Sequence, residues 1–365
     1  EELRTELRKK NGQIGNDGEQ ENSTTDTETI LGVWKFPSKD LVYAAFTSGN
    51  FGLIASILGA ISGQLNEIIN EETIEYIYEV MPGYSNVTVY LALIFAIILV
   101  SWLLSFLGVI FSYTDFKLQK TKKELIITRG FLEKKHITVP FDRIQAVRFV
   151  EGLLRQPFGY GMIYVESAGF DQTQQGRSIV LSPFISSQKL SSFLNEFLPE
   201  YTEPDFEIKP ARRALYRYLR RPNYFIIPLI PLFWYFFSYG WLSLILILVV
   251  SLFGWLKFKD AAIGVDKNIL RMRFRNISRT TAIMKKNRIQ NSELSENPFQ
   301  QRKDLKSLGV TVASGAGGMQ FEVIDLDGND GLGLYHWLTT NKKEEPVEQN
   351  TEGNYSSSDS DSSSK

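Results

Sequence analysis

Arginines are the side chains in this sequence that are best suited to chemistry, and they occur in two settings. Arg143 and Arg288 each open an Arg-Ile-Gln triplet, and Arg155 and Arg302 follow those triplets at similar distances. A second group of five stands close together in one stretch, at Arg212, Arg213, Arg217, Arg220 and Arg221. Guanidinium groups bind carboxylates and phosphates, so all of these are candidate contacts for lipid phosphate or a partner's acidic groups. For Arg143 and Arg288 we favour a structural salt bridge or a snorkelling side chain.

Groups for catalysis or metal binding are sparse. The chain has no cysteine and only two histidines, which excludes disulfides, thiolate metal sites and cysteine nucleophiles. His136 and His336 lie in strand-like and helix-like patterns that favour structural roles. The segment Asp325–Gly331 (DLDGNDG) lacks the terminal glutamate of an EF-hand loop, and a turn before the last helix explains it better. We therefore predict no catalytic residue, no cofactor and no metal site, and a protein that is not an enzyme.

Uncharged apolar runs predict membrane crossings. Val87–Phe111 carries no charge and exceeds the ~20 residues that a spanning helix needs. Residues 41–65 are also uncharged. The 35 residues from 222 to 256 carry no charge, and one helix of that length would run ~50 Å, which is too long for one crossing. A turn at Ser238–Gly240 divides this run into two spans; a single tilted span is the alternative.

The first span has a stripe of small residues. Ala55, Gly59 and Gly63 recur every four residues and so share one helix face. Small residues let two helix backbones approach closely in lipid. We predict that this face packs against another helix, either the second span or the span of a membrane partner.

Charge asymmetry predicts the orientation of the spans. The connection between the first two spans holds five glutamates and no lysine or arginine. The opposite flanks are basic, with Lys117, Lys120, Lys122, Lys123, Lys209, the clustered arginines, Lys257 and Lys259. By the positive-inside rule both termini and the 112–221 region lie in the cytoplasm. With 40 basic and 41 acidic residues, the chain shows no charge signature of a nucleic-acid-binding protein.

Two segments outside the spans repeat each other. The segment from Asp142 to Gly169 matches the one from Asn287 to Gly318, most clearly at the Arg-Ile-Gln triplets. Alternating strand-like runs precede a segment at helical spacing in each copy. This pattern predicts two α+β domains, each a small β-barrel or sandwich closed by a C-terminal helix.

These residues resemble the bacterial pleckstrin-homology-like (PH-like), membrane-flanked domain family, and in particular its YdbT-like multi-domain members. The match is carried by Pro140, Arg143, Ile144, Gln145, Arg155, Phe158, Gly159, Ala168 and Gly169. In the second copy Asn287 replaces the acidic residue before the triplet. The resemblance implies that residues 1–10 are the final helix of a first domain that this sequence otherwise lacks.

The expected domain organisation follows from these observations. It comprises the terminal helix at 1–10, a linker at 11–40, a transmembrane hairpin at 41–111, PH-like domain A at 112–201, a basic amphipathic linker at 202–221, a second hairpin at 222–256, PH-like domain B at 257–340 and a disordered tail at 341–365.

The function expected from sequence is that of a membrane-embedded binding or scaffold protein. Its PH-like domains would face the cytoplasm of a bacterial cell and act in a cell-envelope complex. The expected partners are membrane lipids and a membrane protein or a second copy of the chain, and nucleic acid is not expected. The alternative is a transporter or channel. Against it, the spans contain no charged residue and no histidine, the residues that usually mark ion and proton pathways.

Overall fold

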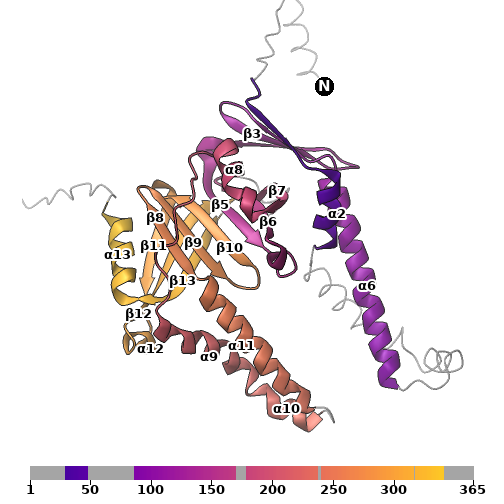
Figure 1. Ribbon diagram of the computed structural model, residues 1–365, viewed down its shortest axis with the longest axis vertical. Coiled ribbons are helices and arrows are strands. Elements are labelled where there is room, and N and C mark those ends of the chain that lie inside the picture. The colour runs from indigo at the N-terminus through magenta and orange to yellow at the C-terminus, as the bar shows by residue number, and fades with distance from the viewer. Residues whose placement is uncertain (1–28, 48–85, 170–177, 237–239, 316, 341–365) are drawn as a thin grey trace, which may run out of the picture.

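The computed structural model describes residues 29–47, 86–169, 178–236, 240–315 and 317–340. These residues form two β-rich bodies, and the helices attached to them project from the same side (Figure 1). The predictions for residues 1–10 and 341–365, for most of the first span, and for Ala55, Gly59 and Gly63 lie outside the described residues.

Domain A is built from two antiparallel sheets and one helix. The first sheet contains β1 (Gly32–Lys35), β2 (Lys117–Lys120), β3 (Glu124–Arg129) and β4 (Lys135–Pro140) in that order. After the 3₁₀ turn η1 (Phe141–Arg143) come β5 (Ile144–Glu151), η2 (Gln156–Phe158), β6 (Tyr160–Ser167), β7 (Ile179–Ser186) and helix α8 (Ser187–Phe197). Apolar side chains alternate along β3 and β4, so one face of this sheet can be buried. Leu125 from the first sheet, Ile163 from the second and Phe197 from α8 share one core.

Domain B repeats this order of elements. It contains β8 (Ala262–Asp266), β9 (Ile269–Arg275), β10 (Arg279–Lys285), η5 (Lys286–Arg288), β11 (Ile289–Ser295), α12 (Pro298–Gln301), β12 (Leu305–Ser314), β13 (Gly317–Asp327) and α13 (Gly328–Thr339). Met272, Val310 and Leu334, from its two sheets and its final helix, lie in one core. Two related domains, each ending in a helix, were predicted, and the structure has this arrangement.

The two domains share one continuous sheet. Its strand order is β7-β6-β5-β10-β9-β8, and β10 pairs antiparallel with β5 from Arg279↔Glu151 to Met284↔Ala146. Ile283 from domain B lies in the core of domain A, and Ala146 from domain A lies in the core of domain B. The predicted alternative of a closed barrel is therefore wrong for the described residues, because β5 pairs with the neighbouring domain instead of closing on β4.

Each domain begins before the segment for which a membrane hairpin was predicted. β1 pairs with β2, although helix α2 (Ser38–Phe46), residues 48–85 and helix α6 (Asn86–Tyr113) lie between them in sequence. Likewise, Ile208 forms an antiparallel bridge with Ile263 across the second hairpin. Parts of the predicted linkers 11–40 and 202–221 therefore belong to the sheets, and each hairpin is an insertion between two paired segments.

One described helix is long and apolar enough to span a membrane. This is α6, whose segment Phe95–Tyr113 has 19 residues and a mean hydropathy of 2.4. The second hairpin contains η3 (Arg212–Ala214), α9 (Leu215–Ile226), α10 (Leu229–Phe236), η4 (Gly240–Leu242) and α11 (Ser243–Asp260). Its helices extend beyond the predicted 222–256 limits into the basic flanks, and α9 lies beside α11 (Figure 1). Residues 237–239, where the turn was predicted, are not described.

Close backbone approach holds the second hairpin together. A Cβ atom added at Gly254 of α11 would lie 2.4 Å from the carbonyl oxygen of Tyr218 on α9, so only glycine fits there without a shift. Asn223 on α9 reinforces the contact, since its Nδ2 donates to Ser251 Oγ on α11 at 2.9 Å. The packing predicted for Ala55, Gly59 and Gly63 of the first span stays a prediction, because these residues are not described. Among the described residues, close helix packing at a glycine is seen between α9 and α11.

Candidate membrane interface and charged joints

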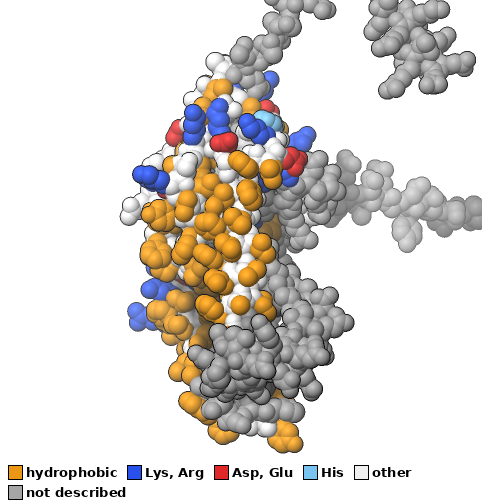
Figure 2. All heavy atoms as spheres, turned by 90° about the vertical axis from the view of Figure 1, so that its right-hand side faces the viewer, with side chains coloured by type: hydrophobic (Ala, Val, Ile, Leu, Met, Phe, Trp, Pro, Cys, Tyr) orange, Lys and Arg blue, Asp and Glu red, His pale blue; other side chains and the backbone are white. Residues whose placement is uncertain are grey.

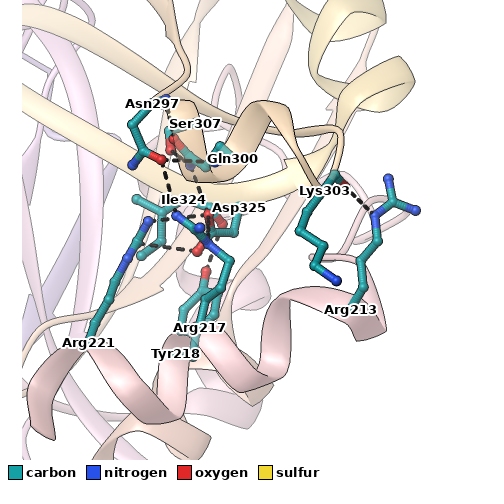
Figure 3. A network of polar contacts seen from close by, with 10 residues as sticks. All are labelled: Arg213, Arg217, Tyr218, Arg221, Asn297, Gln300, Lys303, Ser307, Ile324 and Asp325. Atoms are coloured by element: carbon teal, nitrogen blue, oxygen red, sulfur yellow. Dashed lines mark hydrogen bonds and ion pairs between the residues drawn. The ribbon is translucent and has the colours of Figure 1, made fainter.

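Three linker arginines face domain B. Arg213, Arg217 and Arg221 are four residues apart and so lie on one side of the segment that enters α9. Arg217 Nε lies 3.1 Å from Asp325 Oδ1, and Arg221 Nη1 lies 3.2 Å from Asp325 Oδ2. Figure 3 shows both side chains converging on this carboxylate. The linker arginines therefore have a structural partner inside the protein.

Asp325 is fully buried at the centre of a polar network. Gln300 Nε2 donates to its Oδ1 at 2.8 Å. A reciprocal capping box with Asn297 fixes Gln300 at the start of α12. The Tyr218 hydroxyl on α9 donates to the Ile324 carbonyl at 2.7 Å, and burial raises the pKa of Tyr218. Asp325 also has a positive φ of 57°, a strained conformation for a non-glycine residue. We name Asp325, its partners Arg217, Arg221 and Gln300, and the neighbouring Tyr218 the Asp325 joint.

The three linker arginines outside this joint, Arg212, Arg213 and Arg220, divide into two groups. Arg213 donates to the carbonyl oxygens of Lys303 at 2.7 Å and of Asp304 at 2.8 Å, and its Nη2 lies 2.9 Å from the Asp327 carboxylate. Arg212 and Arg220 are exposed. Arg220 lies between the rings of Tyr216 and Tyr224, 5.2 Å from each centroid. The predicted contact with lipid phosphate stays a prediction, and the exposed Arg212 and Arg220 are the linker arginines without a carboxylate partner among the described residues.

Arg155 holds helix α2 to domain A. Its Nη2 donates to the Ala44 carbonyl at 2.7 Å and its Nε to Thr47 Oγ1 at 3.1 Å, at the C-terminal end of α2. Its Nη1 donates to the Pro183 carbonyl at 3.1 Å. Burial lowers the pKa of Arg155. Its side-chain hydrogen bonds go to uncharged oxygens, and its guanidinium carbon lies 5.5 Å from the centroid of the Phe184 ring. The Ala44 carbonyl, in the last turn of α2, lies at the end of the helix that favours a cation. We name this set the Arg155 joint.

Ion pairs reinforce the sheet between the domains. Arg279 forms a bidentate pair with Glu151, with Nε 2.6 Å from Oε2. Asp260, at the end of α11, bonds Arg275 and lies 3.5 Å from Arg279. On the other side of β5, the buried Glu166 bonds Arg148 at 2.6 Å and also the Ser314 hydroxyl of domain B. The β5–β10 pairing is thus fixed by buried charge as well as by backbone hydrogen bonds.

The remaining sequence-predicted arginines are not brought together. Arg143 is exposed, and its carbonyl accepts from Ala168 N and Gln145 Nε2, each at 3.0 Å. Arg288 is half-buried, and Arg302 is exposed at the end of α12. The backbone carbonyl of Arg143 thus links η1 to the residue that follows β6. The Arg-Ile-Gln triplet therefore acts here through its main chain, and the Arg143 side chain takes no part in these two bonds.

Exposed apolar side chains cover the helices on one side of the molecule. On α6 they are Phe95, Ile98, Leu99, Val100, Leu103, Leu104, Leu107 and Phe111. On α10 and α11 they include Leu229, Leu232, Phe233, Trp234, Leu244, Ile245, Leu248 and Leu252. Figure 2 shows a face covered by such side chains, with charged side chains gathered above them. A patch of this extent marks a membrane or protein contact.

Loops of both domains add to this apolar surface. Leu132, in the β3–β4 turn, is 85% exposed, and Ile277, in the matching β9–β10 turn, is 61% exposed. Phe158 in η2 and Phe299 in α12, each preceded by a proline, are 73% and 63% exposed. We name these four residues the apolar tips. Sequence reasoning missed them, although the repeated Pro-Phe pair was a signal that could have found two of them.

The β3–β4 turn lies at the level of the apolar helix. Phe131 N donates to the Phe111 carbonyl at 3.1 Å, and the two rings stack with centroids 5.9 Å apart. Gly130 N donates to the Thr114 carbonyl at 2.9 Å. Since Phe111 is part of the span Phe95–Tyr113, the first of the apolar tips projects beside the end of the membrane-spanning segment.

Comparison with known proteins agrees with this architecture. The bacterial PH domain family model matches residues 60–197 and 224–340. The UPF0699 transmembrane protein YdbT of Bacillus subtilis (strain 168) is 33% identical over 312 residues, which are 85% of this chain and 63% of that protein. The chain belongs to the bacterial PH domain family. It spans less than two thirds of this relative's length, and the relative is named as a transmembrane protein.

Proposed function

We propose that this protein is a non-enzymatic scaffold of the bacterial cell membrane. In this proposal its PH-like domains lie on the cytoplasmic face, hold two membrane hairpins in a fixed relation, and present binding surface to lipids and to a membrane-protein partner of the cell envelope. The observation that carries the proposal is the unbroken series of rigid connections from one hairpin to the other.

That series runs through three contacts. The Arg155 joint ties the end of α2 to domain A. The β5–β10 pairing, with its Arg279–Glu151 ion pair, ties domain A to domain B. The Asp325 joint ties domain B to α9. Separation would leave charged groups unpaired at the β5–β10 contact and at the Asp325 joint. At the Arg155 joint it would remove hydrogen-bond acceptors from a buried guanidinium, so the energetics favour one arrangement of these elements.

The apolar tips support contact of both domains with the membrane surface. They project from both domains and, at the β3–β4 turn, lie beside α6, where a bilayer would begin. Exposed cations stand close by, at Lys134 and Lys135 after the β3–β4 turn and at Arg220 on α9. Apolar side chains combined with cations suit a surface of anionic lipid headgroups. The domains would then rest on the cytoplasmic leaflet.

Cysteine labelling tests the orientation, and the cysteine-free chain needs no background substitutions. The proposal has four crossings, with Asn70 outside and Ser357 inside. On intact cells an impermeant thiol reagent should label Asn70→Cys and leave Ser357→Cys unlabelled until the membrane is opened. Labelling of Ser357→Cys but not Asn70→Cys on intact cells would refute the orientation.

A further inference from the structure

The contact between the two domains uses different edges on its two sides. Domain A contributes β5, the first strand of its second sheet, and domain B contributes β10, the last strand of its first sheet. Such a head-to-tail contact uses one edge of each domain and leaves the complementary edge of each domain outside it. The counterpart of β10 in domain A is β4, and the counterpart of β5 in domain B is β11. Both are outer strands of their sheets, so each has one edge without a strand partner among the described residues.

The internal repeat fixes the register that a matching contact would have. The Arg-Ile-Gln triplets begin at Arg143 and Arg288, so equivalent residues near them differ by 288 − 143 = 145 in number. Lys134 is therefore the counterpart of Arg279, and Glu296 is the counterpart of Glu151. The observed contact ends at the ion pair of Arg279 with Glu151. Their counterparts at the two unpaired edges, Lys134 and Glu296, carry charges of the same signs.

We propose that β4 of one copy of the protein pairs antiparallel with β11 of a second copy, in the register of β10 with β5. Lys134 then lies opposite Glu296 of the partner subunit, and Thr138 lies opposite Ser292 of the partner subunit. The occupant of the β4 edge is thus a second copy, and the contact is β-strand addition between like domains.

The side chains at the free edges suit a contact between separate molecules. In the observed contact Ile283 lies opposite Val147, and both are buried. At the unpaired edges the counterpart of Ile283 is Thr138, and the counterpart of Val147 is Ser292. Thr138 is exposed and Ser292 is half-buried. Hydroxyl pairs across strands are compatible with pairing, while polar and charged edges limit indiscriminate aggregation. The contact between copies is therefore weaker than the contact within the chain, and the free edges tolerate water.

Charge and membrane geometry both allow this contact. Glu296 is 36% exposed; its Oε2 binds Lys306 and its Oε1 accepts from Gln301 Nε2 at 3.3 Å. Its exposed carboxylate stays accessible to Lys134 of the partner subunit as a further charge partner. β4 begins just after Leu132, and β11 ends just before Phe299. Antiparallel pairing consequently puts these two apolar tips at the same end of the shared sheet. Two copies joined in this way present their apolar tips to one membrane.

Double-cysteine crosslinking tests the register directly. The 365-residue chain, carrying Thr138→Cys and Ser292→Cys, is oxidised in native-like membranes, and its products are separated without reductant. We expect disulfide-linked dimers and, because the contact is head-to-tail, a ladder of larger species. Thr138→Cys with Ser295→Cys is the mismatched control, since Ser295 lies three residues further along β11, ~10 Å at the rise of a strand.

Charge variants sharpen the test. In the matched cysteine pair, Lys134→Glu should lower the dimer yield several-fold, and adding Glu296→Lys should restore part of it. Thermal unfolding of each variant checks that the fold is retained. Absence of dimers from the matched pair, or equal dimers from both pairs, overturns the proposal. A crosslink to a different protein also overturns it, and assigns the β4 edge to that protein.

Discussion

The two repeats attach the helices of their predicted hairpins, α2 and α9, with opposite distributions of charge. In domain A the cation belongs to the domain: Arg155 reaches out to the carbonyl end of α2. In domain B the anion belongs to the domain: Asp325 receives Arg217 and Arg221 from α9. A helix end supplies only partial charges, so the Arg155 joint depends on hydrogen-bond geometry. The Asp325 joint depends on full charges. The two related domains thus attach a neighbouring helix by different interactions. The two joints should therefore respond differently to mutation.

The largest effect is expected at Asp325. Asp325→Asn removes the anion that balances two arginines, and breaking a buried ion pair on one side costs about 3–5 kcal/mol. Thermal or denaturant unfolding of the full chain in nanodiscs measures the loss. Asp330→Asn, at an exposed position in the first turn of α13, is the matched control and should change little. Equal stability of the two variants would contradict the assignment of Asp325 as the joint.

A smaller loss is expected at Arg155. Arg155→Gln deletes a charged donor that bonds three oxygens. The glutamine amide keeps a donor near them, so we expect a net loss equal to that of one hydrogen bond to a charged group, about 1.5–3 kcal/mol. Hydrogen exchange should rise at the end of α2, because the loss is local to that helix, while α9 keeps its protection. Arg143→Gln, at an exposed arginine of the same domain, serves as the control. Faster exchange at α9 instead of α2 would show that Arg155 acts elsewhere.

Alanine substitutions at two glycines compare how closely α11 and α6 pack against their neighbours. Gly254→Ala places a methyl group 2.4 Å from the Tyr218 carbonyl, and overpacking of this kind costs about 1–3 kcal/mol. Gly108→Ala on α6 meets no atom within 4 Å, so it should be neutral or stabilising through helix propensity. Unfolding of both variants in the same nanodiscs gives the difference. If Gly108→Ala proved the more damaging, the packed face would have been assigned to the wrong helix.

The smallest effect on stability is expected at Arg212 and Arg220. Both are exposed, so Arg212→Gln and Arg220→Gln should leave unfolding unchanged. Attachment of a Lys209–Pro222 peptide to anionic vesicles should nevertheless weaken in each variant, and raised salt should abolish the difference by screening. Equal binding of all peptides to neutral and anionic vesicles would remove the electrostatic role of this segment.

Local patterns made much of the fold predictable. The uniform apolar run of α6 is a strong signal, because few soluble helices tolerate it. The repeated triplet revealed two domains because Arg143 and Arg288 stand in matching contexts. β1 escaped prediction because GVWK is only four residues long and is paired with a strand beyond the hairpin.

The joints were not predictable from local patterns. The linker arginines were visible as a basic cluster, but Asp325 lies 108 residues after Arg217 in sequence, inside a segment that indicated a turn. The β5–β10 contact likewise joins strands whose alternation says nothing about their neighbour. Burial and charge pairing at these sites come from tertiary packing, which residue spacing does not encode.

The central claim is that both repeats and their hairpins form one rigid body, and a distance between the domains tests it most directly. Spin labels at Ser192→Cys on α8 and Asn329→Cys on α13 are both at exposed positions. Double electron–electron resonance in nanodiscs should give one narrow distance distribution. Ala282→Pro, which interrupts β10 opposite Arg148, should broaden it, since proline cannot join the middle of a sheet. A broad or two-peaked distribution in the unmodified sheet would contradict the claim.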